Sequence, residues 1–269
     1  MKFTISREAM LKPLNLVAGV VERRQTLPIL ANVLMVLEGD RLSMTGTDLE
    51  VELVGRVQLP EAGESGEVTV PARKLVDICK SLPEGSDIQI AVQDGKAMVR
   101  SGRSRFTLST LPAREYPNVE DSMGTHQFKI LQGQLKRLID RTAFAMAQQD
   151  VRYYLNGMLW ELGGKQLRDV ATDGHRLALC TLPEKVDTDG DTQVILPRKG
   201  VLELARLLLD EDAEVAVVIG SNHIRATTND FTFTSKLVDG KFPDYQRVLP
   251  RSPDKIVLGS RLELRQAFT

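Results

Sequence analysis

The segment Asp173-Gly174-His175-Arg176 brings together residue types that general acid/base catalysis uses. Proton transfer by such a group would also need a positioned partner and a pocket. The Asp-Gly pair fits a plain turn after a strand that ends near Val170, and the related segment 47–50 contains neither His nor Arg. We therefore expect no catalytic role here. Because a turn alone does not require His175 and Arg176, we favour a binding role for them.

Metal and cofactor motifs are missing from the sequence. It contains no Gly-rich phosphate loop, no Cys-x-x-Cys and no His-Glu-x-x-His, and its three His are His126, His175 and His223. The segment 187–191 holds three Asp but lacks the later bidentate Glu of a calcium loop. A nuclease would need clustered carboxylates around a metal ion. We expect no catalytic residue, no metal and no cofactor.

Basic side chains recur at matching places in two halves of the chain, although the net charge is only −1. Such a balance argues against a broad basic surface that grips nucleic acid. If both copies turned the same helices toward one axis, these side chains would line it and could contact phosphates without reading bases. The alternative is that they lie on an ordinary solvent-exposed helix surface. The residues are Arg23, Arg24, Arg73 and Lys74, answered by Gln148, Gln149, Arg152, Arg198 and Lys199.

The two halves are copies of one plan. Phe3 matches Phe128 and Asp48 matches Asp173 at a spacing of 125, and Pro71 then matches Pro197 at a spacing of 126. A repeat of this length indicates a modular assembly. A third copy begins near the end of the chain, where the segment 264–268 resembles the opening helix at 135–139. We expect domains at 1–120 and 128–250, a linker at 121–127 and the start of a truncated third domain at 251–269.

Each copy is expected to contain two helices packed on antiparallel sheets, so the chain is expected to have an α+β fold of tandem repeated domains. Helical spacing of apolar residues predicts helices over 7–18 and 73–82, and again from Leu135 and after Pro197. In the last of these we expect Val201, Leu202, Ala205, Leu208 and Leu209 to pack inward. Alternation over 49–59 predicts a half-buried strand. Asp94-Gly95 predicts a tight hairpin turn.

Composition suits a globular protein that stays inside the cell. Hydrophobic residues make up 42% of the chain, aromatic ones 5%, and no stretch resembles a secretory signal or a membrane span. Cys79 and Cys180 lie in different copies, so we expect free, buried thiols in a reducing compartment. We expect a cytoplasmic protein with no membrane partner.

Seven segments together resemble the bacterial DNA polymerase III beta subunit, the sliding clamp family. The resemblance runs in order along the whole chain and rests on residues 26–30, 45–50, 70–74, 100–106, 149–157, 171–177 and 235–245. Members of this family have three such domains per subunit and pair head to tail into a ring around duplex DNA, with helices lining the hole. The resemblance thus implies a non-catalytic processivity factor in DNA replication.

The resemblance also implies which residues contact DNA. Weak and non-specific contacts would suit a ring that slides, because each neutralised phosphate adds about 0.9 to the salt slope. The implied DNA-binding residues are Arg24, Arg73, Gln149, Arg152, Tyr153, Tyr154, Arg198 and Lys199.

Partner proteins of the family insert a short peptide motif into a groove between the second and third domains. The implied partners are the DNA polymerase III catalytic subunit, the clamp loader, other polymerases and repair proteins. The matching groove residues are Leu155, Thr172, Gly174, His175, Arg176, Leu177, Pro243, Arg247 and Val248.

The ring contact in the family joins the first domain of one subunit to the third domain of the next. The implied first-domain side is Lys74, Arg103, Arg105, Phe106 and Leu108. The homodimer is expected of a three-domain subunit, and we expect a chain that ends at Thr269 not to close the ring.

The main alternative is a peptide-docking adaptor with the clamp fold that never encircles DNA. Retention on nicked circular DNA that is lost when the DNA is linearised would separate the two functions, provided that a full-length, three-domain subunit is used.

Overall fold

The computed structural model describes residues 1–21, 27–117, 124–186, 190–250 and 254–269. Within them the first domain has the order β1-α1-β2-β3-β4-β5-α2-β6-β7-β8. Its elements are β1 Lys2–Ser6, α1 Arg7–Ala18, β2 Asn32–Glu38, β3 Arg41–Thr47, β4 Val51–Gln58, β5 Gly66–Pro71, α2 Ala72–Ser81, β6 Asp87–Gln93, β7 Lys96–Ser101 and β8 Ser104–Ser109, with 3₁₀ turns at Pro28–Ala31 and Ala113–Glu115.

The second domain repeats the same order, which confirms the repeat predicted from the sequence. Its elements are β9 His126–Leu131, α3 Gln132–Thr142, β10 Gly157–Gly163, β11 Gln166–Thr172, β12 Leu177–Thr181, β13 Thr192–Pro197, α4 Arg198–Leu207, β14 Glu214–Ile219, β15 His223–Thr227 and β16 Phe231–Lys236, with 3₁₀ turns at Ala143–Ala145, Tyr153–Leu155 and Tyr245–Arg247. β9 begins at His126, so the last two residues of the expected linker lie in a strand.

Each domain contains two antiparallel sheets, and one sheet from each domain joins the other. In domain 1 the strand orders are β1-β6-β7-β8 and β5-β2-β3-β4; in domain 2 they are β9-β14-β15-β16 and β13-β10-β11-β12. β4 pairs with β16, with Leu53 opposite Phe233, and so makes one continuous eight-stranded sheet across the two domains. Backbone hydrogen bonds therefore join the two domains, and the main apolar cores of both domains form one contiguous cluster.

The helices form where the sequence pattern places them. α1 begins at Ser6, whose hydroxyl accepts the Ala9 N–H at 3.3 Å, and buries Met10, Leu14 and Val17. The helix predicted over 7–18 is confirmed. In and just after α4 the prediction was partly wrong: Leu202 and Leu209 are 47% and 76% exposed, whereas Val201 and Leu208 are buried as predicted. Leu204 and Leu207 face the core together with Val201, because a helix at 3.6 residues per turn brings these three to one side.

The strand predicted over 49–59 is confirmed over 51–58, although Glu52 on its expected solvent side is buried, and the turn predicted at Asp94-Gly95 is confirmed. β4 covers 51–58, and Asp94 and Gly95 both have positive φ, at 51° and 69°, as a two-residue hairpin turn requires. Both cysteines are free; Cys79 is buried and Cys180 is half-buried, so only the first is a true core residue.

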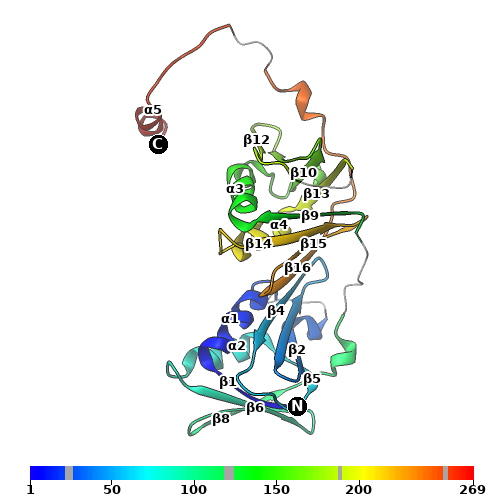
Figure 1. Cartoon of the computed structure of the whole chain (residues 1–269), viewed down its shortest axis with the longest axis vertical. Coiled ribbons are helices and arrows are strands. Elements are labelled where there is room, and N and C mark those ends of the chain that lie inside the picture. Colours follow the sequence, from blue (N-terminus) through cyan, green and yellow to red (C-terminus); the bar gives the residue numbers. More distant parts are fainter. Residues whose placement is uncertain (22–26, 118–123, 187–189, 251–253) are drawn as a thin grey trace.

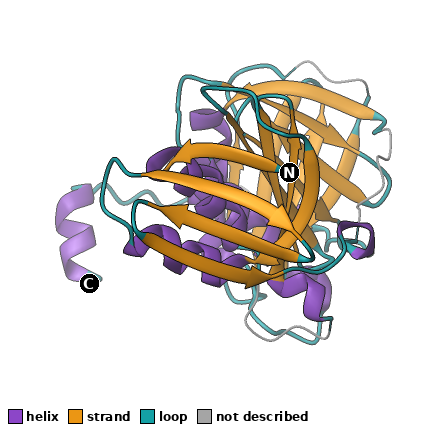
Figure 2. Ribbon diagram, turned by 90° about the horizontal axis from the view of Figure 1, so that it is seen from below, coloured by secondary structure: helices purple, strands orange, loops and turns teal. Residues whose placement is uncertain are grey.

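α5 (Arg261–Ala267) forms the helix expected near the end of the chain, but none of its residues is buried. Figures 1 and 2 show it standing apart from the two domains. No helix of the described residues has the length and apolar character to span a bilayer. The expected acidic loop at 187–191 lies mostly outside the described residues.

Candidate functional site

Positive charge gathers on the helices. α1 to α4 together hold eleven Lys and Arg against four Asp and Glu, a net charge of +7. Since the whole chain has a net charge of −1, the rest carries −8. Figure 1 shows these four helices along the same side of the strands in both domains. A neutral protein therefore presents one cationic side formed by helices, which suits contact with phosphates.

Of the residues expected to contact DNA, Arg73, Arg198 and Lys199 lie on these helices, whereas Gln149, Arg152, Tyr153 and Tyr154 lie in the segment before β10. Several of them are already engaged by other groups. Arg73 is exposed in the first turn of α2, and Tyr153 is 57% exposed. Arg198 begins α4 and donates to the Met146 carbonyl at 3.4 Å, so its position is partly fixed. Lys199 pairs with Asp48 of domain 1. Arg24 lies outside the described residues.

Arg152 is held by an acidic neighbour that sequence reasoning missed. Its guanidinium donates twice to the Asp150 carboxylate, at 3.1 and 2.8 Å, and once to the Asp173 carbonyl at 3.3 Å. These bonds lower the pKa of Asp150 to about 2. Gln149 precedes this pair with a left-handed φ of 58°. DNA would have to compete with Asp150 for Arg152.

The turn 172–176 is a structural turn and not an acid/base centre. The Asp173 carboxylate accepts the His175 and Arg176 backbone N–H groups, each at 2.9 Å, and pairs with the Arg176 side chain. These hydrogen bonds lower the pKa of Asp173 to about 2, so it stays ionised near neutral pH. Gly174 has a φ of +89°, which few other residues tolerate. The Arg176 guanidinium lies 5.6 Å from the centre of the Phe144 ring.

Among the described residues no group of three or more His, Cys, Asp and Glu is placed to hold a metal ion. His175 is exposed, and its backbone N–H donates to the Asp173 carboxylate.

Domain 2 has a second apolar cluster, here named the groove cluster, apart from its main core. It lies on the sheet face that points away from the helices, since Met158 and Trp160 on the other face pack into the main core. Its members are Ala147, Leu155, Leu159, Val170, Ile195, Phe242 and Tyr245, with Tyr154, Leu177 and Val238 packed against it.

Three positions of the groove cluster region carry apolar residues in domain 2 and polar ones in domain 1. Strand register places Thr45, Glu52 and Thr69 of domain 1 where domain 2 has Val170, Leu177 and Ile195.

In domain 1 the equivalent cluster is smaller and mixes apolar with polar groups. Ile29, Leu30 and Tyr116 are buried in it. Asn32 donates to Thr69, and the Tyr116 hydroxyl donates to the Thr45 carbonyl at 3.0 Å. The fold itself therefore does not require apolar residues at the places of Val170, Leu177 and Ile195. This difference makes the groove cluster a candidate for binding apolar side chains.

A polar rim beside the groove cluster orients Tyr245. Its hydroxyl donates to Glu161 at 2.5 Å and accepts from Arg168 at 3.0 Å, while Arg168 and Glu161 lie 3.6 Å apart. Sequence reasoning did not single out these three residues. The repeat contained a signal, because the positions equivalent to Glu161 and Arg168 in domain 1 are Val36 and Ser43.

The structure brings the expected groove residues to one region, at different depths. Leu155 is only 2% exposed, so it forms the floor of the cluster, and Leu177 packs beside it. Thr172, Gly174, His175 and Arg176 form the neighbouring turn. Pro243, Arg247 and Val248 follow Phe242, and Val248 is 68% exposed.

The residues of the expected ring contact lie on or near the edge strand β8, except Lys74 on α2, and one of them needs a correction. β8 is the outer strand of its sheet, and Arg103 and Arg105 on it or beside it are exposed, as is Lys74 on α2. Phe106 is half-buried. Leu108 is only 5% exposed and belongs to the domain core, because alternation along β8 turns it inward.

Residues 1–120 match the family described as "DNA polymerase III beta subunit, N-terminal domain", and residues 129–244 match its "central domain". The chain belongs to the DNA polymerase III beta subunit family. A beta sliding clamp of Pseudomonas aeruginosa is 67% identical over all 269 residues, which cover 73% of that relative. One from Escherichia coli is 55% identical over 268 residues, with the same coverage of 73%.

Solved structures agree with the family and with the fold. The DNA polymerase III subunit beta of Pseudomonas aeruginosa superimposes with a TM-score of 0.96 over all of this chain and 73% of that one, at 67% identity. The Bacillus subtilis sliding clamp gives 0.88 over 94% of this chain and 68% of that one, at 31% identity. One Pseudomonas aeruginosa clamp structure is bound to griselimycin. The family is one of non-catalytic processivity factors.

Proposed function

We propose that this protein acts in the cytoplasm as a DNA sliding clamp, which encircles duplex DNA as a head-to-tail dimeric ring and tethers the replicative polymerase. The observation that carries this proposal is the separation of charge, +7 on helices α1 to α4 and −8 elsewhere. A cationic lining attracts phosphates, whereas an acidic exterior avoids binding DNA on the wrong side. Arg73, Arg198, Gln149, Arg152, Tyr153 and Tyr154 are the proposed DNA contacts.

The way the two domains join supports head-to-tail assembly. β16 of domain 2 pairs with β4 of domain 1. In the repeat, β8 corresponds to β16, and β12 corresponds to β4. Both β8 and β12 are outer strands of their four-stranded sheets.

Each outer strand is thus ready for the same kind of pairing with a further domain. We propose that β8, with Lys74, Arg103, Arg105 and Phe106, is one side of the subunit contact.

The groove cluster supports peptide docking by the polymerase III catalytic subunit, the clamp loader and other clamp-binding proteins. One Leu and one Phe anchor would contribute about 1.5–3 kcal/mol each before ordering costs. Such a peptide should therefore bind near micromolar affinity, and partners can exchange. We propose Leu177, Arg176, Pro243, Arg247 and Val248 as its contacts, with Leu155 as the floor.

The experiment that tests the clamp function is topological. A three-domain subunit that contains this chain is loaded onto nicked circular duplex by its clamp loader, and the retained fraction is measured by gel filtration before and after linearisation. A clamp is retained on the circle and lost from the linear DNA. A peptide-docking adaptor that never encircles DNA would be retained on neither, and equal retention on both would show ordinary DNA binding.

A further inference from the structure

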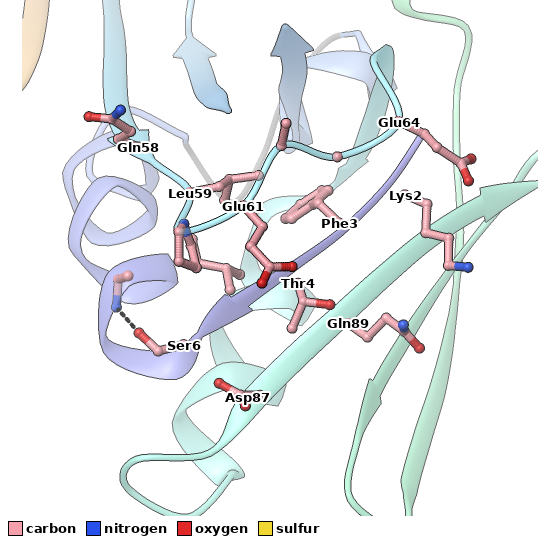
Figure 3. A pocket seen from close by; sticks show the side chains of 15 residues that line it. Lys2, Phe3, Thr4, Ser6, Gln58, Leu59, Glu61, Glu64, Asp87 and Gln89 are labelled. Carbon is pink, nitrogen blue, oxygen red and sulfur yellow. Dashed lines mark hydrogen bonds between the residues drawn. The ribbon is translucent and has the colours of Figure 1, made fainter. Parts of the chain in front are cut away.

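Domain 1 has an open corner between its two sheets. Lys2 of β1 and Glu64 exchange two backbone hydrogen bonds, at 3.1 and 2.8 Å, and so connect β1 to the segment 58–64. Beyond this pair the segment moves away from β1. Figure 3 shows the hollow that opens between them, here named the corner hollow.

The side of β1 that faces this hollow is an unpaired strand edge. The Val92 N–H donates to the Met1 carbonyl, and the Arg7 N–H donates to the Ser86 carbonyl. In the β1–β6 register, these bonds show that the odd-numbered residues of β1 are the ones that hydrogen-bond to β6. Phe3 and Ile5 therefore bond to β6, and the Thr4 N–H and C=O point away from it. Among the described residues the structure gives neither Thr4 group a hydrogen-bond partner. An edge of this kind can accept another strand.

The rim of the corner hollow is acidic. Glu61, Glu64 and Asp87 are exposed, and Lys2 is the one cation among the described lining residues. None of these three carboxylates forms an ion pair with another described residue. Figure 3 shows the Glu61 carboxylate directed toward Thr4, with Gln89 and Asp87 on the adjacent strand.

The segment that forms the far wall is fixed in place. The Gly63 N–H donates to the Gly39 carbonyl at 3.0 Å. A Cβ at Gly63 would lie 2.5 Å from the Lys2 carbonyl oxygen and 2.9 Å from the Phe3 Cβ. Glycine is therefore required for this close approach. Because the segment is held in this position by contacts within the chain, the corner hollow is already formed without a ligand.

We propose that the corner hollow binds an extended basic segment of a partner protein, which adds to β1 as a short strand. Main-chain hydrogen bonds to Thr4 would provide binding, and Lys or Arg side chains of the segment would pair with Glu61, Glu64 and Asp87. This chemistry differs from that of the groove cluster, which takes apolar side chains. A partner with both kinds of segment would hold the protein at two points, one on each domain.

The test titrates the ¹⁵N-labelled protein with three acetylated, amidated pentapeptides. TKVKT carries two lysines, TEVET reverses the charge, and TKPKT lacks the central N–H. We expect TKVKT to shift the Thr4 amide resonance and to bind with a Kd on the order of 100 µM. TEVET and TKPKT should each bind at least tenfold more weakly. Equal binding of TEVET, or shifts that map away from β1, would overturn the proposal, as would no shift at millimolar peptide.

Variants of the protein separate the charge from the strand edge. Glu61→Lys combined with Glu64→Lys should weaken TKVKT at least tenfold, whereas Glu115→Lys, an exposed control in the same domain, should not. Thr4→Pro should abolish binding and keep the fold, because that N–H lies outside the β1–β6 ladder. If Thr4→Pro fails to fold, the charge variants decide, and unchanged affinity in them refutes the proposed site.

Discussion

The Lys199 ammonium at the start of α4 pairs with the Asp48 carboxylate in the turn between β3 and β4, so a charge pair joins the two domains. The Asp48 side chain is 7% exposed and also accepts the Glu50 and Val51 N–H groups, at 2.9 and 2.7 Å. A second pair across the same boundary, Lys12 with Asp230, is 62% and 57% exposed. Lys199 therefore helps to join the two domains, in addition to any contact with DNA.

Removing the buried pair should cost more than removing the exposed one. Lys199→Met leaves the nearly buried Asp48 carboxylate without its cation, so we expect a loss of about 1–3 kcal/mol in unfolding free energy. Lys12→Met, the matched control, should cost under about 1 kcal/mol. Urea unfolding of both variants, at low and high salt, makes the measurement. Equal losses would show that burial of Asp48 does not matter.

Cationic residues on the helices should determine the salt dependence of DNA binding. If Arg73 and Arg198 each contact one phosphate, Arg73→Ala and Arg198→Ala should each reduce the log–log salt slope by about 0.9. The measurement is the affinity for a short duplex between about 50 and 200 mM salt. Arg114→Ala, an exposed residue outside the four helices, should leave the slope unchanged. A slope altered only by Arg114→Ala would place the DNA elsewhere.

Much of the fold could be predicted because its local signals agree with one another. The match of Phe3 to Phe128 and of Pro71 to Pro197 indicated two copies, and Asp94-Gly95 indicated a hairpin by its tolerance of positive φ. Helix α1 could be predicted because its apolar residues recur at helical spacing. The hairpin and helix signals depend only on neighbours in the sequence, and the repeat depends on the similarity of two segments of the chain.

Side-chain depth and pairing could not be predicted in the same way. Leu108 was expected at a surface and lies in the core, and Leu202 was expected in the core and lies at the surface. The burial of Leu108 and of Leu202 depends on which face of its strand or helix packs against the neighbouring elements. The Lys199–Asp48 pair joins residues 151 apart in the sequence, and only the β4–β16 pairing brings them together.

Apolar residues that distinguish domain 2 should control peptide binding. Leu177→Glu restores the residue found at the equivalent place in domain 1, and should weaken a Leu- and Phe-containing clamp-binding peptide by about tenfold or more, because an anchor contributes about 1.5–3 kcal/mol. Fluorescence anisotropy of the labelled peptide measures the loss. Leu179→Glu, a half-exposed neighbour on the same strand but outside the groove cluster, is the control. An equal loss in both variants would point to general disruption of β12.

Asp169 should make the stability of domain 2 depend on pH. It is fully buried, neither of its carboxyl oxygens has a partner among the described residues, and burial raises its pKa well above the usual value. It lies opposite Trp160, the single Trp of the chain, in the β10–β11 pairing. Trp fluorescence therefore reports on unfolding at this very position.

The sign follows from the direction of the shift. A carboxyl group whose folded pKa is raised loses stability as pH climbs from its unfolded pKa of about 3.9 toward the folded value, because only the unfolded state then ionises freely. Asp169→Asn cannot ionise, so its advantage in unfolding free energy over the parent should grow with pH across this window and then level off. Asp212→Asn, an exposed control, should show no such growth. If the advantage of Asp169→Asn stayed constant between pH 4 and 9, Asp169 would have the same pKa in the folded and the unfolded protein. The raised pKa assigned to it would then be wrong.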